Sequence, residues 1–208
     1  MNIVVLAAGE GTRMKSVLPK VLHQISGRSM LGHVLAVAEQ LGAAHTVVVC
    51  AANTIGQISA TFGPRYAYVV QHERLGTGHA VLQARELLAD SPGEVLVLYA
   101  DSPLIQAATA QSLVDALRQA GALVGLLSFH ATPLVGYGRV LRDQAGQVLE
   151  LVEERNASPD QLAISEGNSG FMAFDGAWLW SRVGQIPRNP VKGEFYLTDL
   201  VAMAVAER

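Results

Sequence analysis

The chain alternates short runs of β-branched and aliphatic residues with longer segments in which apolar residues recur every three or four positions. Short runs of this kind predict buried strands, and the longer segments predict amphipathic helices. The expected strands cover residues 3–6, 46–50, 66–70, 95–99 and 123–129, and the expected helices cover residues 30–41, 53–61, 78–89 and 107–120. This alternation predicts an α/β fold with a doubly wound, mostly parallel sheet.

The residues at the expected helix ends agree with this pattern. Ser29 and Thr77 stand where helix N-caps are expected. Gly42 and Gly121 stand where helices commonly end in glycine.

The alternation stops after about residue 130. Segments 139–142 and 147–153 flank a turn-forming Asp-Gln-Ala-Gly stretch and predict a hairpin. Segment 168–174 predicts another strand, and 197–207 predicts a final helix. We therefore expect a mixed β extension on the parallel sheet.

Composition limits the classes of partner. Half of the 208 residues are hydrophobic and only 16% are charged, which argues against disorder. Fifteen lysines and arginines against eighteen acidic residues give a net charge of −3. A general nucleic-acid or membrane-surface binder is expected to be basic, so we expect neither partner.

The single cysteine, Cys50, lies in an apolar run and has no second cysteine to pair with. This is typical of a reducing compartment, and a small buried hydrophobe explains the residue better than a catalytic thiol. The chain also has no apolar stretch near the roughly 18–20 residues of a membrane span, and its N-terminus lacks the features of a signal peptide. We therefore expect a cytoplasmic protein.

A glycine-rich loop follows the first expected strand, and it reads Leu6-Ala7-Ala8-Gly9-Glu10-Gly11-Thr12-Arg13-Met14. Small residues there let backbone N–H groups approach an anion. Met14 replaces the third glycine of a dinucleotide fingerprint, and the acidic residue expected near positions 51–53 is missing. Arg13 and Lys20 add two cations, which suit a polyphosphate better than a nicotinamide dinucleotide. From the residues alone, solvated surface side chains explain the two cations equally well.

Five motifs then occur in one order along the chain. They are residues 6–14 with 18–23, residues 75–80 (Leu-Gly-Thr-Gly-His-Ala), 99–101 (Tyr-Ala-Asp), 136–139 (Gly-Tyr-Gly-Arg) and 193–199 (Gly-Glu-Phe-Tyr-Leu-Thr-Asp). The first resembles the signature of sugar-nucleotide pyrophosphorylases, which are Rossmann-like nucleotidyltransferases of the GT-A type. Together the motifs resemble the N-terminal uridylyltransferase domain of the bifunctional N-acetylglucosamine-1-phosphate uridylyltransferase/glucosamine-1-phosphate acetyltransferases.

The resemblance implies a nucleotide-binding side. Leu6, Ala7, Ala8 and Gly9 match the backbone segment that holds uridine, and Tyr99 and Ala100 belong to the same substrate-binding set. Gln71 matches the glutamine that reads the uracil edge, with Gly76 and Thr77 beside it. A side-chain amide offers a pyrimidine both a donor and an acceptor. Arg13 and Lys20 match the residues that face the phosphates and are the catalytic candidates.

Asp101 is the candidate metal ligand. It follows the buried-looking run 95–100, so its carboxylate is expected at the carboxyl end of a strand, where a hard oxygen ligand can hold Mg²⁺ between two phosphorylated substrates. Without the resemblance, an aspartate that caps the turn with Ser102 and Pro103 would remain an ordinary alternative. Ala100 and Ser102 depart from the family pattern, and we expect the methyl group of Ala100 to crowd the nucleotide.

The second half of the chain matches the sugar-binding side. Gly138, Glu153 and Asn168 correspond to family positions that contact N-acetylglucosamine. From the residues alone, Glu153 could belong to a charged face and Asn168 could form a turn. Lys192 is open to two interpretations, a phosphate contact or an exposed surface lysine.

The resemblance implies that a phosphate oxygen of N-acetylglucosamine 1-phosphate attacks the α-phosphorus of UTP and releases pyrophosphate. The product, UDP-N-acetylglucosamine, is a precursor of the cell wall and of lipopolysaccharide. The nucleophile is already anionic, so catalysis is expected to consist of positioning and of charge neutralisation by Mg²⁺, Arg13 and Lys20.

Several alternatives stay open. The sugar phosphate could be another one, such as glucose 1-phosphate, and the domain could bind nucleotide sugars without turnover. An NAD-dependent oxidoreductase is disfavoured by the glycine loop. Relatives in the resembling family supply a second Mg²⁺ ligand, an asparagine, downstream of the last motif, and oligomerise through a β-helix domain. We expect residues 1–208 to form one nucleotidyltransferase domain that is incomplete at its C-terminus and lacks the β-helix.

Overall fold

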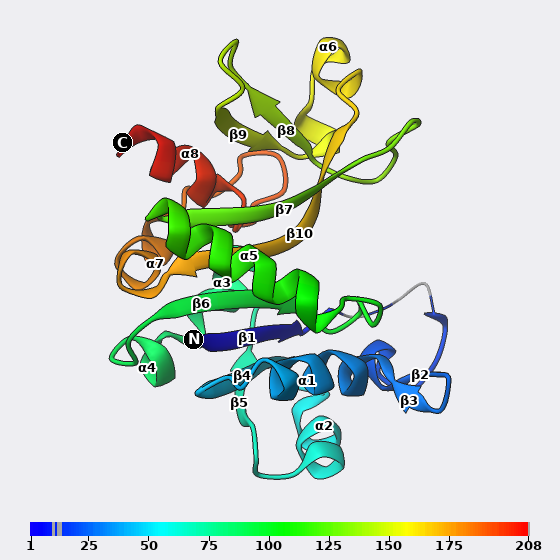
Figure 1. Cartoon of the computed structure of the whole chain (residues 1–208). Helices are drawn as coiled ribbons and strands as arrows, with labels where there is room; N and C mark the ends of the chain where they lie inside the picture. The colour runs from blue at the N-terminus through cyan, green and yellow to red at the C-terminus, as the bar shows by residue number, and fades with distance from the viewer. Residues whose placement is uncertain (10, 12–13, 208) are drawn as a thin grey trace.

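The computed structural model describes residues 1–9, 11 and 14–207. Four parallel strands form one half of its main sheet, in the order β5-β4-β1-β6 (Figure 1). Their bounds are β1 (Asn2–Ala7), β4 (His45–Ala51), β5 (Ala67–Gln71) and β6 (Glu94–Tyr99). All four were expected from the sequence. Because the strands are parallel, their carboxyl ends meet at one edge of the sheet, where ligands bind in folds of this kind.

The other half of the sheet is built on the long strand β10 (Glu166–Asp175), which pairs antiparallel with β6. β7 (Val124–His130) and β8 (Arg139–Arg142) pair antiparallel with β10, and β9 (Val148–Val152) pairs with β8. The predicted mixed extension is therefore confirmed. Its consequence for the site is that β10 brings residues 168–170 beside the carboxyl end of β6.

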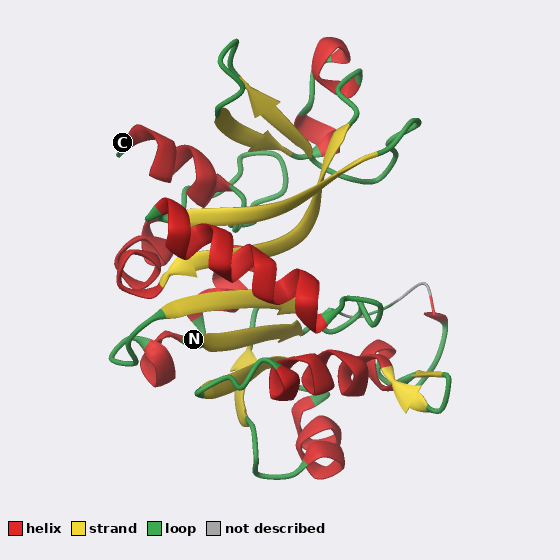
Figure 2. Cartoon of the chain, in the orientation of Figure 1, coloured by secondary structure: helices red, strands yellow, loops and turns green. Residues whose placement is uncertain are grey.

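Helices cover both faces of the sheet, which confirms the doubly wound prediction (Figure 2). One face packs against α1 (Met30–Gln40), α2 (Ile55–Phe62) and α5 (Ala107–Ala120). The other packs against α3 (Thr77–Leu82), α4 (Arg85–Leu88), α7 (Gly176–Arg182) and α8 (Asp199–Ala206). Side chains of β1 alternate between the faces, with Ile3 and Val5 in the first cluster and Val4 in the second.

The remaining short elements are η2 (Lys20–Leu22), β2 (Gln24–Ile25), β3 (Arg28–Ser29), η3 (Glu154–Asn156), α6 (Pro159–Leu162) and η4 (Val183–Gln185). The sequence analysis did not predict α7. Asp175 is its N-cap, because the Asp175 carboxylate accepts a hydrogen bond of 2.8 Å from the backbone N–H of Trp178. No helix in the described ranges is long and apolar enough to cross a membrane.

The cap predictions have mixed outcomes. Ser29 caps α1 by accepting a 3.2 Å hydrogen bond from the Gly32 N–H, and Gly42 and Gly121 adopt positive φ of 62° and 55°. Thr77 is not an N-cap; it is the first residue of α3, and Gly76 holds the cap position. The Thr77 hydroxyl instead accepts a 3.0 Å hydrogen bond from the backbone N–H of Leu197. The hydroxyl that was expected to cap the helix therefore makes a long-range contact.

The expected helix 78–89 is divided into α3 and α4. At the division, the backbone N–H groups of Gln83 and Ala84 bond to carbonyls three residues back rather than four. This tighter turn leaves the His79 carbonyl free to accept a 2.9 Å hydrogen bond from the side-chain amide of Gln83. The final helix begins at Asp199 rather than at 197.

Cys50 is fully buried in the core, as expected. Burial raises the pKa of its thiol to about 12, so the thiol stays protonated and unreactive at neutral pH.

Candidate functional site

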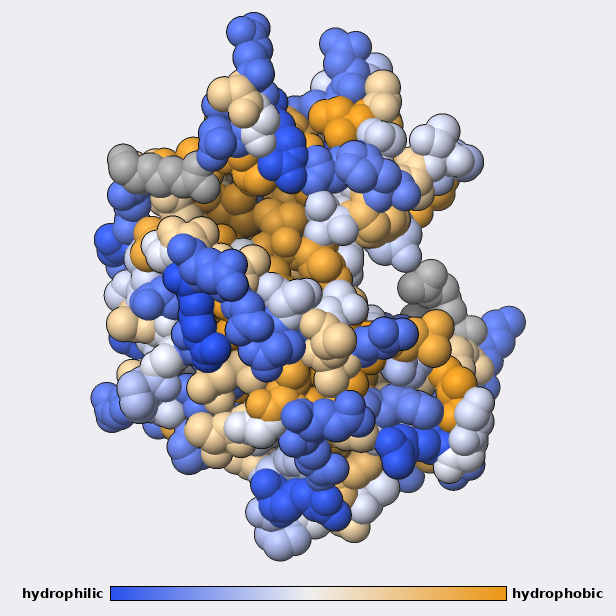
Figure 3. All heavy atoms as spheres, in the orientation of Figure 1, coloured by the Kyte–Doolittle hydropathy of each residue, from blue (hydrophilic) through white to orange (hydrophobic). Residues whose placement is uncertain are grey.

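A cavity of about 520 Å³ lies at the carboxyl edge of the parallel strands. One wall comes from the loops that follow β1, β5 and β6, and the other from the mixed half of the sheet and the segment before α8. Figure 3 shows the surface hollowed below the loop that follows β7. The cavity therefore occupies the place that the sheet topology predicts for a ligand.

Most of the predicted site residues lie together in this lining, and they are Leu6, Ala7, Ala8, Gly9, Lys20, Gln71, Gly76, Thr77, Tyr99, Asp101, Gly138, Glu153 and Asn168. Arg13 lies outside the described residues. Lys192 is exposed and is not among the described residues of the lining.

Ala100 does not line the cavity. Its side chain is fully buried in the core cluster that contains α1 and α5, and its backbone N–H donates a 3.0 Å hydrogen bond to the carbonyl of Leu6. The methyl group points into the protein interior, so the predicted crowding of the nucleotide by Ala100 is wrong.

Lys20 and Asp101 form an ion pair within the cavity. The Lys20 Nζ lies 2.5 Å from the Asp101 Oδ2, and the two side chains remain 26% and 38% exposed. Gly11, at φ +62°, packs against the lysine stem so closely that a Cβ there would lie 2.4 Å from the Lys20 Cβ. Gly11 thus allows the backbone to lie directly against the Lys20 stem, while the Lys20 ammonium group and the Asp101 carboxylate stay accessible to a ligand.

Asp101 is a residue that could hold a divalent metal ion. No group of three or more His, Cys, Asp or Glu side chains converges within the described ranges, so these residues offer no cage made by protein alone. Mg²⁺ is commonly held by one or two carboxylates together with phosphate oxygens and water. A single accessible carboxylate beside the Lys20 ammonium group is compatible with that mode.

Gln71 ends β5 and is only 5% exposed. Its amide nitrogen donates a 3.0 Å hydrogen bond to the Gly76 carbonyl and lies 3.1 Å from the His79 Nδ1. The Gln71 side chain is therefore buried and hydrogen-bonded at the cavity wall rather than solvated on a loop.

The segment before α8 supplies Glu194, Tyr196 and Thr198 to the cavity lining, and none of the three was predicted as a site residue. Phe195 joins this segment to the loop after β5: its N–H donates to the Leu75 carbonyl at 2.7 Å, and its carbonyl accepts from the Gly78 N–H at 2.8 Å. Alternate residues of an extended segment face opposite sides. The buried Leu197 faces the core, and the alternation within residues 193–199 was the signal that could have identified the lining residues.

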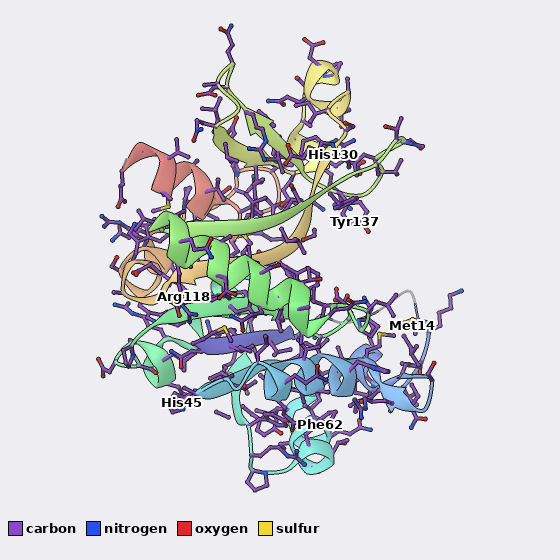
Figure 4. The ribbon with its side chains drawn as sticks, in the orientation of Figure 1. Met14, His45, Phe62, Arg118, His130 and Tyr137 are labelled. Carbon is purple, nitrogen blue, oxygen red and sulfur yellow. The ribbon has the colours of Figure 1, made fainter. Side chains whose placement is uncertain are left out.

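Other lining residues were also missed, namely Val21, Arg74, Ala80, Ser102, Gly136, Tyr137, Ser169 and Gly170. Tyr137 projects from the loop between β7 and β8, below the mixed half of the sheet in Figure 4. Gly170 lies against Tyr99, and a Cβ at position 170 would come within 3.1 Å of that ring.

Glu153 and Asn168 form the opposite wall. The Glu153 carboxylate accepts a 3.3 Å hydrogen bond from the Thr198 hydroxyl, and burial raises the pKa of this carboxyl. The Asn168 Oδ1 accepts a 3.0 Å hydrogen bond from the Gly170 N–H, so the asparagine does form a turn. No hydrogen bond within the described part of the chain uses its amide nitrogen. The wall therefore offers both a donor and acceptors to a polar ligand.

Asp199 makes the stability of the protein depend on pH. Burial, followed by the charges of Glu153 and Glu150, raises the pKa of this carboxyl from 3.8 to about 6. The folded state therefore holds the proton more tightly than the unfolded state, and the free energy of unfolding falls as the pH rises from about 4 to 6. Allowing for the partial exposure of the group, we expect this loss to be about 1–2 kcal/mol.

The Asp199→Asn variant isolates this contribution, because the asparagine side chain does not ionise between pH 4 and pH 7. Urea unfolding at pH 4 and pH 7 should show the variant gaining about 1–2 kcal/mol relative to wild type between the two pH values. If the free energies of unfolding of the variant and the wild type change equally between pH 4 and pH 7, the raised pKa of Asp199 is contradicted.

Comparisons with known proteins are consistent with this site. The family model described as MobA-like NTP transferase domain matches residues 3–164. The chain is 48% identical over 210 aligned residues to the bifunctional protein GlmU of Azotobacter vinelandii, and 46% identical over 207 to that of Stutzerimonas stutzeri. Each alignment covers 100% of this chain and 45% of the relative, so the chain spans less than half the length of these relatives.

A solved structure of a UDP-glucose pyrophosphorylase complexed with UDP-glucose has the same fold. It superposes with a TM-score of 0.77 at 15% sequence identity, over 100% of this chain and 87% of that protein.

Proposed function

This chain belongs to the family of MobA-like NTP transferase domains, and from that premise we propose that it transfers UMP from UTP to N-acetylglucosamine 1-phosphate. The products are UDP-N-acetylglucosamine and pyrophosphate. Similarity to the bifunctional GlmU proteins along the whole chain supports this choice of reaction.

One observation carries the proposal: a single cavity collects three kinds of group that this reaction requires. Gln71 offers a buried amide to a base. Lys20 offers a positive charge to phosphates, beside the carboxylate of Asp101. Glu153 and Asn168 offer an acceptor and a donor to a sugar that carries hydroxyl and acetamide groups.

In the proposed reaction, a phosphate oxygen of the sugar phosphate forms a bond to the α-phosphorus of UTP. The bond between this phosphorus and the oxygen that bridges to the β-phosphorus breaks, and pyrophosphate leaves. Both substrates are anions, so their approach requires positive charge, which Lys20 supplies here and Arg13 is proposed to supply as well. Asp101 would hold a Mg²⁺ ion, which when bound neutralises phosphate charge.

The remaining work of the protein is positioning. Residues 6–9 and Gly76 present backbone to the nucleotide, Gly138 allows close approach of the sugar, and Tyr99 and Thr77 complete the wall. The walls hold the two substrates in one cavity, which replaces a bimolecular encounter in water by a reaction between bound groups.

We propose that this reaction takes place in the cytosol, because a single unpaired cysteine is typical of a reducing compartment. The product is proposed to serve peptidoglycan and lipopolysaccharide synthesis.

Pyrophosphate release tests the proposal directly. With UTP, Mg²⁺ and N-acetylglucosamine 1-phosphate we expect turnover, and we expect kcat/KM for glucose 1-phosphate to be at least about tenfold lower, because the groups that bind the acetamide would be left unpaired. UTP binding without pyrophosphate release would identify a binding module instead. A higher kcat/KM for glucose 1-phosphate would identify that sugar phosphate as the substrate. Reduction of NAD with an alcohol would reject the proposed nucleotidyltransferase function.

A further inference from the structure

The loop between β7 and β8, residues 131–138, supplies Gly136, Tyr137 and Gly138 to the cavity lining. Residues 135–137 of this loop are exposed to solvent. An exposed loop keeps one shape only where other groups hold its backbone. Arg139, the first residue of β8, is such a group.

Arg139 is buried although it carries a charge, and its side chain is only 3% exposed. Its guanidinium group donates hydrogen bonds to the backbone carbonyls of Tyr137 and Leu134, the second at 2.6 Å. A longer contact of 3.4 Å reaches the carbonyl of Leu162, the last residue of α6. The guanidinium group therefore binds the first and last residues of the stretch 134–137 and joins this stretch to α6.

Glu154 holds the same loop from the segment that follows β9. Its Oε1 accepts a 2.8 Å hydrogen bond from the backbone N–H of Gly136 and lies 3.6 Å from the Nη1 of Arg139. The carboxylate thus offsets the charge of the buried guanidinium group. Glu154 directly follows Glu153, which lines the cavity. The loop is therefore joined to the chain segment that carries the proposed acceptor for the sugar.

The chemistry of Arg139 suits the fixing of a loop better than the filling of a core. A buried ion pair is weak evidence for stability, because the cost of removing its charges from water offsets much of their attraction. A planar guanidinium group, in contrast, presents several donors in fixed directions and can bind two carbonyls at once. An apolar side chain offers no donor, and a lysine ammonium group is a single point.

We propose that Arg139 is a positioning residue for the sugar phosphate. It fixes residues 134–137, so that Tyr137 and Gly138 stay opposite the groups that bind the sugar. None of its hydrogen bonds within the described part of the chain reaches Gln71 or Gly76 on the nucleotide side. The inference rests on the proposed function, because that function assigns this part of the cavity to the sugar.

Steady-state kinetics and calorimetry test the inference on Arg139→Lys. The KM for N-acetylglucosamine 1-phosphate, at saturating UTP and Mg²⁺, should rise roughly tenfold, which is the effect of losing a hydrogen bond from a charged donor. We expect kcat to stay within about a factor of three, because sugar contacts are lost alike in the bound and the transition state. The dissociation constant of UTP should change by less than about twofold, since its site lies on other loops.

Arg142→Lys is the matched control. Arg142 lies on the same strand, and its guanidinium group binds the Glu166 carboxylate at 2.7 Å rather than the loop. The same substitution there should leave the KM for the sugar phosphate within about a factor of two.

Two variants of Glu154 separate positioning from a merely structural role. Glu154→Ala removes the acceptor for the Gly136 N–H and should raise the KM for the sugar phosphate roughly threefold. Glu154→Gln keeps an acceptor oxygen and should recover most of this loss. If circular dichroism shows that Arg139→Lys does not fold, this pair carries the test, because the Glu154 side chain is 35% exposed and water can reach the groups that it leaves.

An unchanged KM in folded Arg139→Lys would overturn the inference, as would equal KM values for the two Glu154 variants if the lysine variant is unfolded. A parallel loss of UTP affinity would show a general structural role and would overturn it as well. In these cases, pyrophosphate release by the wild type leaves the proposed function standing. If the wild type releases no pyrophosphate with any sugar phosphate, the inference falls together with the proposed function.

Discussion

Replacing Asp101 with alanine is expected to lower the rate of pyrophosphate release by about 10³-fold. The substitution removes the carboxylate proposed to hold Mg²⁺ and also the partner of Lys20 at 2.5 Å. Losses of about 10²–10³ follow removal of a single preorganised electrostatic group, and loss of a metal ligand places the effect at the upper end. The measurement is kcat with saturating UTP, N-acetylglucosamine 1-phosphate and Mg²⁺.

A second aspartate gives the matched control. Asp115 lies on α5 with a side chain that is 45% exposed, 3.6 Å from Arg118. Asp115→Ala removes the same group from the surface and should leave kcat within about a factor of two, because exposed ion pairs contribute little. If Asp101→Ala and wild type release pyrophosphate at equal rates, Asp101 has no role in the reaction.

Gly76→Ala is expected to reduce the free energy of unfolding by about 4 kcal/mol and to abolish UTP binding. Gly76 has φ +98° and ψ 179°, a region that only glycine occupies readily, and a side chain there costs about 1–3 kcal/mol. An added Cβ would also lie 2.6 Å from the Phe195 carbonyl oxygen and 2.9 Å from its nitrogen. Because these are backbone atoms, relief requires a shift of the segment before α8, at a further cost of about 1–3 kcal/mol.

Such a shift damages the site as well as the fold. It breaks the hydrogen bonds that join Phe195 to Leu75 and Gly78, and it moves Glu194, Tyr196 and Thr198 in the cavity wall. Urea unfolding and UTP calorimetry measure the two effects.

Gly56→Ala provides the comparison for Gly76→Ala. Gly56 is an exposed residue of α2, and a Cβ there would meet no atom within 4 Å. Alanine should therefore stabilise the protein by about 0.5–1 kcal/mol through its higher helix propensity. Equal effects of the two substitutions would contradict the proposed strain at Gly76.

Much of the fold follows from local patterns. The apolar runs of β1, β4 and β6 identify buried strands, since a strand covered on both faces must be apolar at every position. The three- and four-residue spacing of α1 and α5 identifies helices, and glycine at position 121 marks where α5 ends. In each case the signal lies within a few neighbouring residues. Helix α7 was missed, because its N-cap Asp175 follows a long strand without a break in the apolar pattern.

The candidate site was predicted largely through motifs, and the lining residues missed in the segment before α8 depend on a long-range pairing. Tyr196 and Thr198 reach the cavity because Phe195 pairs with a loop more than a hundred positions earlier in the chain. The alternation within residues 193–199 shows which residues share a face, but no local pattern shows that this segment lies against a loop so distant in the chain. Ala100 was predicted to lie in the site because it is adjacent to Asp101 in the sequence. Its side chain instead points into the core.

The sequence by itself determined the strands, most helices, the glycine loop and the identities of the polar residues available for chemistry, because each depends on short-range periodicity or residue type. Only the tertiary structure decided which of these groups are neighbours and in what state they meet. In the folded protein, the Thr77 hydroxyl accepts a hydrogen bond from the backbone N–H of Leu197. The tertiary structure pairs Lys20 with Asp101 across 81 positions, and it directs the Gln71 amide nitrogen to the Gly76 carbonyl. Hydrogen bonds and charges act over a few ångströms in space, whatever the separation along the chain.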